Sequence, residues 1–170
     1  MVRMLWLVVV GAVACAPTVT TFHGRSVYHG VENKVEQVGP GHWAGTWRTI
    51  GVNVDRVGEK GEEALWCTES GAFDGVWEPT GALTSCTNKS KSICYAGDGS
   101  SSTAESTSTC KPGLKEGLLM FEGTSRKLSG TGRFEGGDMT VTWTSWQLTQ
   151  PPGDLSYSIY TTTVTNPPRK

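Results

Sequence analysis

Short β-prone runs separated by turn signals recur along almost the whole chain, and this regularity restricts the fold more than any other feature. The main runs cover residues 43–54, 62–68, 82–87, 91–96, 103–109, 118–121, 138–148 and 155–164. Counted from start to start, they follow one another at intervals of 9–20 residues, and almost nothing between them has helical spacing. The pattern predicts an all-β protein: a single antiparallel β-barrel of about eight strands, because closure removes the exposed edges of a sheet.

The stretch from Phe121 to Trp146 is expected to contain the hairpin around which the sheet is organised. Glycine-rich residues 123–132 predict a turn, after which the chain returns at residues 133–135 and leaves as the strand 138–148. Elsewhere, Ser70-Gly71 and the polar residues 88–90 predict interruptions between strands. Residues 103–109 lack large apolar groups, which favours a polar strand at a sheet edge over the alternative of a disordered linker.

The N-terminus has the features of an export signal. Arg3 precedes an apolar run, Met4 to Val13, that is too short to span a bilayer as a helix. Ala12-Val13-Ala14-Cys15 then resembles a bacterial lipoprotein signal, in which the cysteine becomes the lipid-bearing first residue. The alternative is an ordinary signal peptide cut near the same place. We therefore expect an exported cell-envelope protein attached to a membrane through Cys15, with the outer membrane preferred, and otherwise a secreted one.

These features divide the chain into four parts. Residues 1–14 are the expected signal peptide, and residues 15–42 contain the lipid-attachment cysteine followed by a tether or a first strand. Residues 43–165 form the expected barrel domain, and residues 166–170 form a free tail. About 155 residues remain after signal removal, which is enough for a single core.

Four cysteines follow Cys15, and an even number in an exported chain predicts two disulfides. They are Cys67, Cys86, Cys94 and Cys110. A zinc site is disfavoured, because no pair has CxxC spacing and no histidine lies among them. The turn at residues 97–100 favours the pairing Cys94–Cys110, which leaves Cys67–Cys86, although the sequence leaves the other connectivities open.

Composition and motifs exclude several classes of function. The formal net charge is −1 and no basic patch occurs, so nucleic acid is not expected as a partner. No G-x-S-x-G motif is present, and His23, His29 and His42 do not have the spacing of a metal-ligand set. We expect no catalytic residue, no metal and no cofactor, and we interpret Glu122 and its acidic neighbours as solvated turn residues.

Tryptophan is the residue type that most indicates a ligand. Six of the seven tryptophans follow the expected signal, and each buries a large apolar area and needs a partner for its indole N–H. They are expected either to fill the core and the barrel floor or to line a cavity or rim for an apolar or sugar ligand. Trp43 and Trp47 are an even number of residues apart on one strand, so they are expected to share a face. Trp143 and Trp146 are an odd number apart, so one of them is expected on the outside. The candidate ligand-binding residues are Trp43, Trp47, Trp66 and Trp143.

Residues 98–99 and 121–134 together resemble a known family. They are similar to the GGTGKFxGAxG hairpin of the barrel shared by allene oxide cyclases, dirigent proteins and many bacterial exported proteins. Glu122 and Ser125 stand where that family has glycine. The resemblance implies an eight-stranded antiparallel barrel, and no catalytic residue of the cyclases is carried over. The alternative is a lipocalin-like barrel, because Gly45-Thr46-Trp47 resembles the lipocalin GxW motif.

Three functions remain after these exclusions. The first is a non-catalytic, lipid-anchored envelope protein whose barrel binds a small apolar ligand or an envelope partner. The second is a purely structural or interaction module, for which a wide exposed aromatic patch would be the sign. The third is a cyclase- or isomerase-type enzyme that acts in an apolar barrel cavity.

Overall fold

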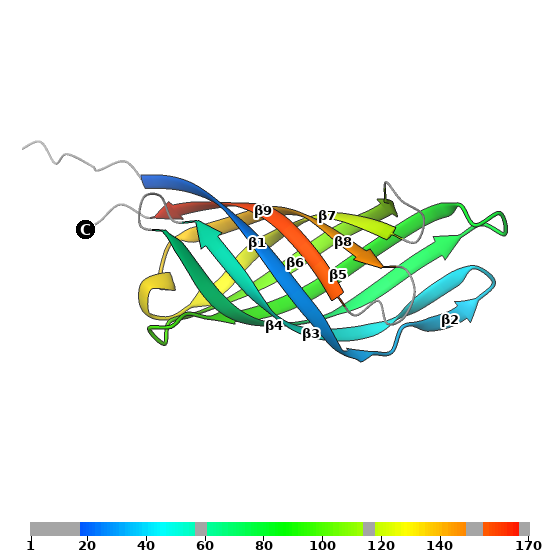
Figure 1. Ribbon diagram of the computed structural model, residues 1–170, viewed down its shortest axis with the longest axis horizontal. Coiled ribbons are helices and arrows are strands. Elements are labelled where there is room, and N and C mark those ends of the chain that lie inside the picture. Colours follow the sequence, from blue (N-terminus) through cyan, green and yellow to red (C-terminus); the bar gives the residue numbers. More distant parts are fainter. Residues whose placement is uncertain (1–17, 57–60, 114–117, 149–154, 167–170) are drawn as a thin grey trace, which may run out of the picture.

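The computed structural model describes residues 18–56, 61–113, 118–148 and 155–166 (Figure 1). The expected signal peptide and Cys15 lie outside these residues. Nearly all of the described chain is β-strand, with one short 3-10 helix, η2. The elements are β1 (Thr18–Asn33), β2 (Glu36–Gly39), β3 (His42–Arg56), β4 (Glu62–Trp77), β5 (Leu83–Tyr95), β6 (Ser101–Pro112), β7 (Leu118–Gly130), η2 (Gly132–Phe134), β8 (Asp138–Leu148) and β9 (Leu155–Asn166).

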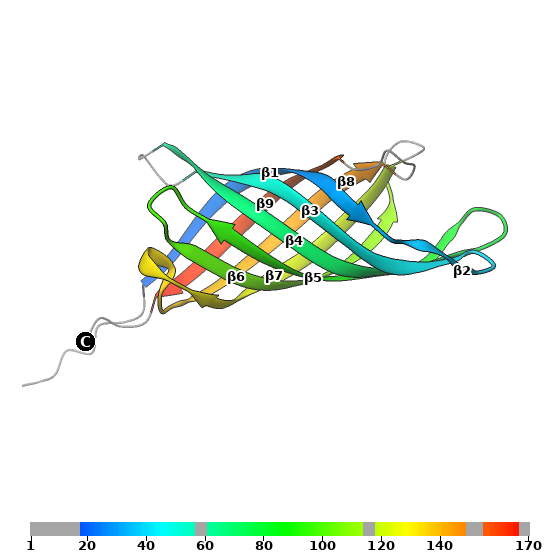
Figure 2. The ribbon, with the colours of Figure 1, turned by 90° about the horizontal axis from the view of Figure 1, so that it is seen from below.

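The strands form a closed antiparallel barrel, which confirms the predicted fold class. Each strand from β3 to β9 pairs with the next along the chain, and β1 pairs with both β9 and β3 (Figures 1 and 2). The register followed around the ring from Gly45 returns to β3 at Asp55, ten residues farther along. Such a shift over eight strands corresponds to a strand tilt of roughly 40°.

The first strand, one of the two alternatives for residues 15–42, is confirmed as β1, so the barrel begins at Thr18 and not at the boundary expected at Trp43. β1 alternates buried Ser26 and Tyr28 with exposed Val27 and His29, which is the pattern of a strand with one inward face. β2 follows β1 after residues 34–35, which belong to no strand, and pairs with the start of β3. Both segments therefore belong to the sheet.

β4 and β5 run without a break through positions expected to interrupt them. Gly71 lies in β4 because the ring of Trp47 occupies the space above it: a Cβ at this position would lie 2.7 Å from Cζ2 of the indole. In β5, Asn88 and Ser90 are not turn residues but inward-facing hydrogen-bonding groups. Asn88 and Ser90 form hydrogen bonds with other side chains inside the barrel, so their polarity does not indicate exposure to solvent.

The glycine-rich stretch after Phe121 is also a strand, so the predicted turn over residues 123–132 is wrong. β7 continues to Gly130, and its Gly123 makes room for the indole of Trp143 on β8, whose Cζ2 would lie 2.5 Å from an added Cβ. Ser125 accepts a hydrogen bond of 3.0 Å from Nε1 of the same indole. Glycine here provides space for an aromatic ring on the neighbouring strand.

β6 does not lie at a sheet edge. It pairs with β5 on one side and β7 on the other. Its inward positions between residues 102 and 108 are all small and buried, namely Ser102, Ala104, Ser106 and Ser108. Small inward residues on this wall leave room for the large inward side chains of other strands.

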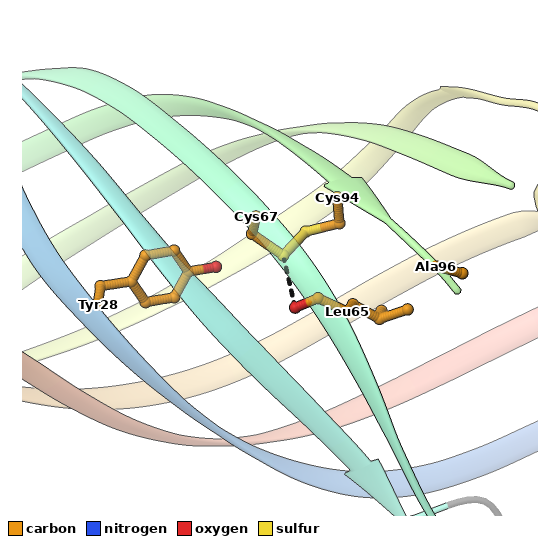
Figure 3. Close-up of a cluster of buried hydrophobic side chains, with 5 residues drawn as sticks. All are labelled: Tyr28, Leu65, Cys67, Cys94 and Ala96. Carbon is orange, nitrogen blue, oxygen red and sulfur yellow. Dashed lines mark hydrogen bonds between the residues drawn. A yellow bond between two sulfur atoms is a disulfide. The ribbon is translucent and has the colours of Figure 1, made fainter. Parts of the chain in front are cut away.

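The segment 131–137, which we name the cap, lies at the end of the barrel where both described termini are found (Figures 1 and 2). The expected strand at residues 133–135 is instead η2 followed by a turn. Phe134 packs against a buried cluster formed by Tyr28, Leu65, Cys67, Cys94 and Ala96 (Figure 3). Arg133 forms ion pairs with Glu63 and, at 3.8 Å, with Asp98, which hold the cap against β4 and the β5–β6 turn.

Two disulfides are present, but the favoured pairing is wrong. Cys67 bonds to Cys94, its direct register partner across β4 and β5, and Cys86 bonds to Cys110 across β5 and β6. Cys94 is opposite Ser102 on β6, so the turn at residues 97–100 does not bring it to Cys110. The two bridges tie β5 to a neighbour near each of its ends.

Candidate functional site: the inner face of β4

Alternate residues of β4 face the barrel interior and change in character along the strand. Leu65 and Cys67 belong to the buried cluster beneath the cap. The next inward positions are Glu69, then Gly71, then Phe73. From the cap end, the inner face therefore passes from an apolar cluster to an acidic group and then to an aromatic region.

Glu69 is a carboxyl group enclosed by the barrel. Ser90 on β5 donates a hydrogen bond of 2.5 Å to its Oε1. Burial raises the pKa of the Glu69 carboxyl, and the Ser90 hydrogen bond opposes this only in part. Thr49 is its register partner on β3, and the buried Oγ1 of Thr49 has no hydrogen-bond partner within the described part of the chain.

Trp47 is positioned beside this acidic group by two contacts. Its indole covers Gly71, and its Nε1 donates a hydrogen bond of 2.9 Å to Oδ1 of Asn88 on β5. Because the indole N–H is satisfied by the protein, the ring is fixed across β4 with its apolar surface on the inner side of the sheet.

An aromatic cluster follows at the end of the barrel opposite the cap. The ring centroids of Phe73 and Trp77 are 6.2 Å apart, and Phe73 meets Phe121 edge-on at 6.5 Å. Trp43 on β3 is the register partner of Gly75 on the same inner face and is 42% exposed. Here β2–β3 and the β4–β5 hairpin project beyond the other strands (Figures 1 and 2), so this aromatic surface is only part-buried.

The four tryptophans expected to bind a ligand do not lie together. Trp43, Trp47 and Trp143 are on the inner face of the barrel, each opposite a glycine of the neighbouring strand. Trp66 is on the outer face and is 69% exposed. Trp66 is adjacent to the inward-facing Cys67, and neighbouring residues of a strand face opposite sides. The outward position of Trp66 therefore follows from the sequence once Cys67 is assumed to form a disulfide inside the barrel.

Trp66 is part of an apolar surface on the outside of the barrel. It is directly opposite Tyr95, and both rings are at least half exposed. Three further exposed residues lie close by in the register, and we name the five the outer aromatic patch. They are Val27, Ile50, Trp66, Ile93 and Tyr95.

The histidines and the acidic residues of the stretch 121–146 form no site. His42 contacts Asp74 at 3.1 Å, and His23 contacts Thr161 at 3.1 Å, in separate parts of the barrel. Glu122 faces outward and pairs with Lys111 at 3.0 Å. Among the described residues, no group of three or more potential ligands is arranged to hold a metal ion.

Glu69 is the functional candidate that the sequence pattern did not single out. Its even spacing from Cys67 was the available signal, because a bonded cysteine pair inside a small barrel fixes which positions of the strand face inward.

Comparisons with family models, with curated proteins and with solved structures find no match. Within the described ranges, no helix has the length and apolar character needed to cross a bilayer. The function must therefore be inferred from the site.

Proposed function

We propose that this is an exported, lipid-anchored envelope protein of non-catalytic type that binds a small ligand with an apolar body on the inner face of its barrel. The observation that carries the proposal is the part-buried aromatic surface of Trp43, Phe73 and Trp77. Ligand sites are typically concave apolar surfaces with a few fixed polar groups. Glu69 supplies such a group deeper along the inner face of β4.

The cell location is supported by chemistry and by sequence. Two disulfides fit an oxidising, exported environment. Cys15, in its lipoprotein-like context, is three residues before Thr18, where β1 begins at the cap end. An acyl chain on Cys15 would hold the cap end next to the membrane and direct the aromatic cluster away from it.

Binding of a neutral aromatic probe tests the ligand part of this proposal. We expect 2-(2-naphthyl)ethanol to bind the mature protein lacking Cys15, as measured by isothermal titration calorimetry. Phe73→Ala should weaken binding by about tenfold, because it removes ring contacts worth roughly 1–2 kcal/mol. Tyr95→Ala, on the outer face, is the matched control and should bind as the wild type does. Absence of measurable binding to the wild type would overturn the ligand proposal.

The anchor is tested separately. The protein purified from its own envelope should have a mass that begins at Cys15 with acyl chains attached. A bare polypeptide mass would remove the anchor and leave a secreted protein.

The outer aromatic patch supports a second candidate function, docking of an envelope partner. The patch combines an indole that is 69% exposed with a half-exposed tyrosine and three exposed aliphatic residues. Contiguous exposed apolar surfaces of this kind often mark interaction sites. A photo-crosslinking amino acid at Trp66 should yield a defined adduct in the native envelope, and the same group at Thr107 on the outside of β6 should not. Equal labelling from both positions would count against the patch.

A further inference from the structure

The charge of Glu69 has no counter-charge in the described part of the barrel. Within the described residues, its only hydrogen bond comes from Ser90, and none of the ion pairs includes it. An enclosed carboxylate is costly unless a cation or further donors accompany it. Glutamine or serine at position 69 would avoid this energetic cost, yet the chain has a glutamate there.

Lys127 and Arg133, two basic side chains at the cap end of the barrel, already have partners in or beside the cap. The Nζ of Lys127, which lies in the same register row as Glu69, donates to the carbonyl oxygens of Phe134 and Gly136. Arg133 pairs with Glu63 and Asp98. These two basic side chains therefore complete the cap, and neither forms an ion pair with Glu69.

Beside Glu69 lies a buried polar atom that has no partner among the described residues. Oγ1 of Thr49, directly across from Glu69 on β3, is buried and has no partner among the described residues. Buried polar atoms are almost always hydrogen-bonded, so an unpartnered hydroxyl next to a carboxylate without a counter-charge leaves room for a polar partner, and a donor would suit both groups. One donor group between β3 and β4 would satisfy both oxygens.

We infer that the ligand carries a cationic amine, which binds between Glu69 and Thr49 while its apolar body lies against Trp47 and the aromatic cluster. This inference rests on the proposed function. A primary or secondary ammonium has a positive charge for the carboxylate and several N–H donors, so it fits both acceptors. One inward step along β4, from Glu69 to Gly71 beneath Trp47, is about 6.6 Å, which sets the spacing between the amine and the first ring.

A matched pair of probes isolates the amine. The cation is 2-(2-naphthyl)ethylammonium, and its neutral counterpart is 2-(2-naphthyl)ethanol, which has the same ring and spacer. At pH 8, calorimetry on the mature protein should show the ammonium binding at least about tenfold more tightly than the alcohol. Lowering the pH until Glu69 is protonated should abolish the preference, because the carboxyl then carries no charge.

Two variants assign the preference to one residue. Glu69→Gln keeps an acceptor for Ser90 and removes the charge, so the ammonium should lose its advantage and the two probes should bind with equal affinity. Glu105→Gln, on the exposed face of β6, is the control and should keep the preference. As a measurement that needs no variant, the NMR pKa of the Glu69 carboxyl should fall when the ammonium probe binds.

Each outcome is decisive. Equal binding of both probes to the wild type would overturn the cationic inference and leave the proposed function standing. No binding of either probe would overturn both. A preference for the ammonium that survives Glu69→Gln, or a Glu69 pKa that does not move on binding, would place the cation elsewhere and would also overturn the inference.

Discussion

Replacing Gly71 by alanine tests whether inward aromatic rings fix where glycine must occur in the strands of this barrel. A methyl group at this position would lie 2.5 Å from the carbonyl oxygen of Lys89, 2.7 Å from Cζ2 of Trp47 and 2.8 Å from Cβ of Ser90. All three distances are well inside the 3.5–4.0 Å at which heavy atoms attract. The Lys89 oxygen belongs to the backbone of β5, so it cannot retreat without disturbing the β4–β5 pairing.

The expected cost has two parts. Overpacking of this kind destabilises a protein by about 1–3 kcal/mol. Displacement of the Trp47 ring would also break its 2.9 Å hydrogen bond to Asn88, which is worth about 1 kcal/mol. We therefore expect Gly71→Ala to lower the free energy of unfolding by about 2–4 kcal/mol, and a loss of about 3 kcal/mol would lower the Tm by roughly 6–12 °C.

The assay is guanidinium unfolding followed by circular dichroism and tryptophan fluorescence, with Gly97→Ala as the matched control. Gly97 lies in the β5–β6 turn, has no left-handed φ, and has no atom within 4 Å of an added Cβ. Alanine there should change the free energy of unfolding by no more than about 1 kcal/mol, in the stabilising direction. If the two variants prove equally stable, the explanation of Gly71 by the Trp47 ring is wrong.

Three further predictions concern the cap, a disulfide and the enclosed acid. Phe134→Ala should lower the free energy of unfolding by about 2 kcal/mol in denaturant titration, because the ring is only part-buried in its cluster; a loss below 0.5 kcal/mol would show that the cap does not stabilise the barrel. Replacing Cys67 and Cys94 together by serine should lower it by about 3–4 kcal/mol, since their bridge spans 27 residues, and peptide mapping without reduction should recover this pair and not Cys67–Cys86. Glu69→Gln should stabilise the protein at pH 8 but not at pH 4: burial raises the pKa of the carboxyl, so the wild type loses stability as pH rises from the unfolded pKa through the raised one. A difference in Tm that is the same at both pH values would contradict this.

The fold was predictable because alternation and turn spacing report directly on strands. The strand over residues 138–148 has the predicted bounds, and β3 and β9 differ from prediction by only two residues at most at any end. The errors arose where glycine or polar residues lie inside a strand. A glycine in the sequence can indicate either a turn or a strand position that leaves space for an aromatic ring. The two cases are distinguished only by the residues of the neighbouring strand.

The site was only partly predictable, for a related reason. Spacing alone placed Trp43 and Trp47 on one face, and both are on the inner face of the barrel. It did not identify that face as the inner one, so Trp66 was grouped with the inward tryptophans and Glu69 was overlooked. The pairing of the four cysteines follows from the strand register. The register depends on hydrogen bonds between distant segments and not on any local pattern.

The two bridges at opposite ends of β5 also change what a protease can do to this protein. A cut at the β4–β5 tip, near Thr80, falls within the loop closed by Cys67 and Cys94. A cut in the turn at Asp98 falls within the loop closed by Cys86 and Cys110. In either case the two fragments stay covalently joined and every strand keeps its neighbours. The barrel can therefore be nicked at either of these exposed turns and remain one molecule, until a reductant separates the pieces.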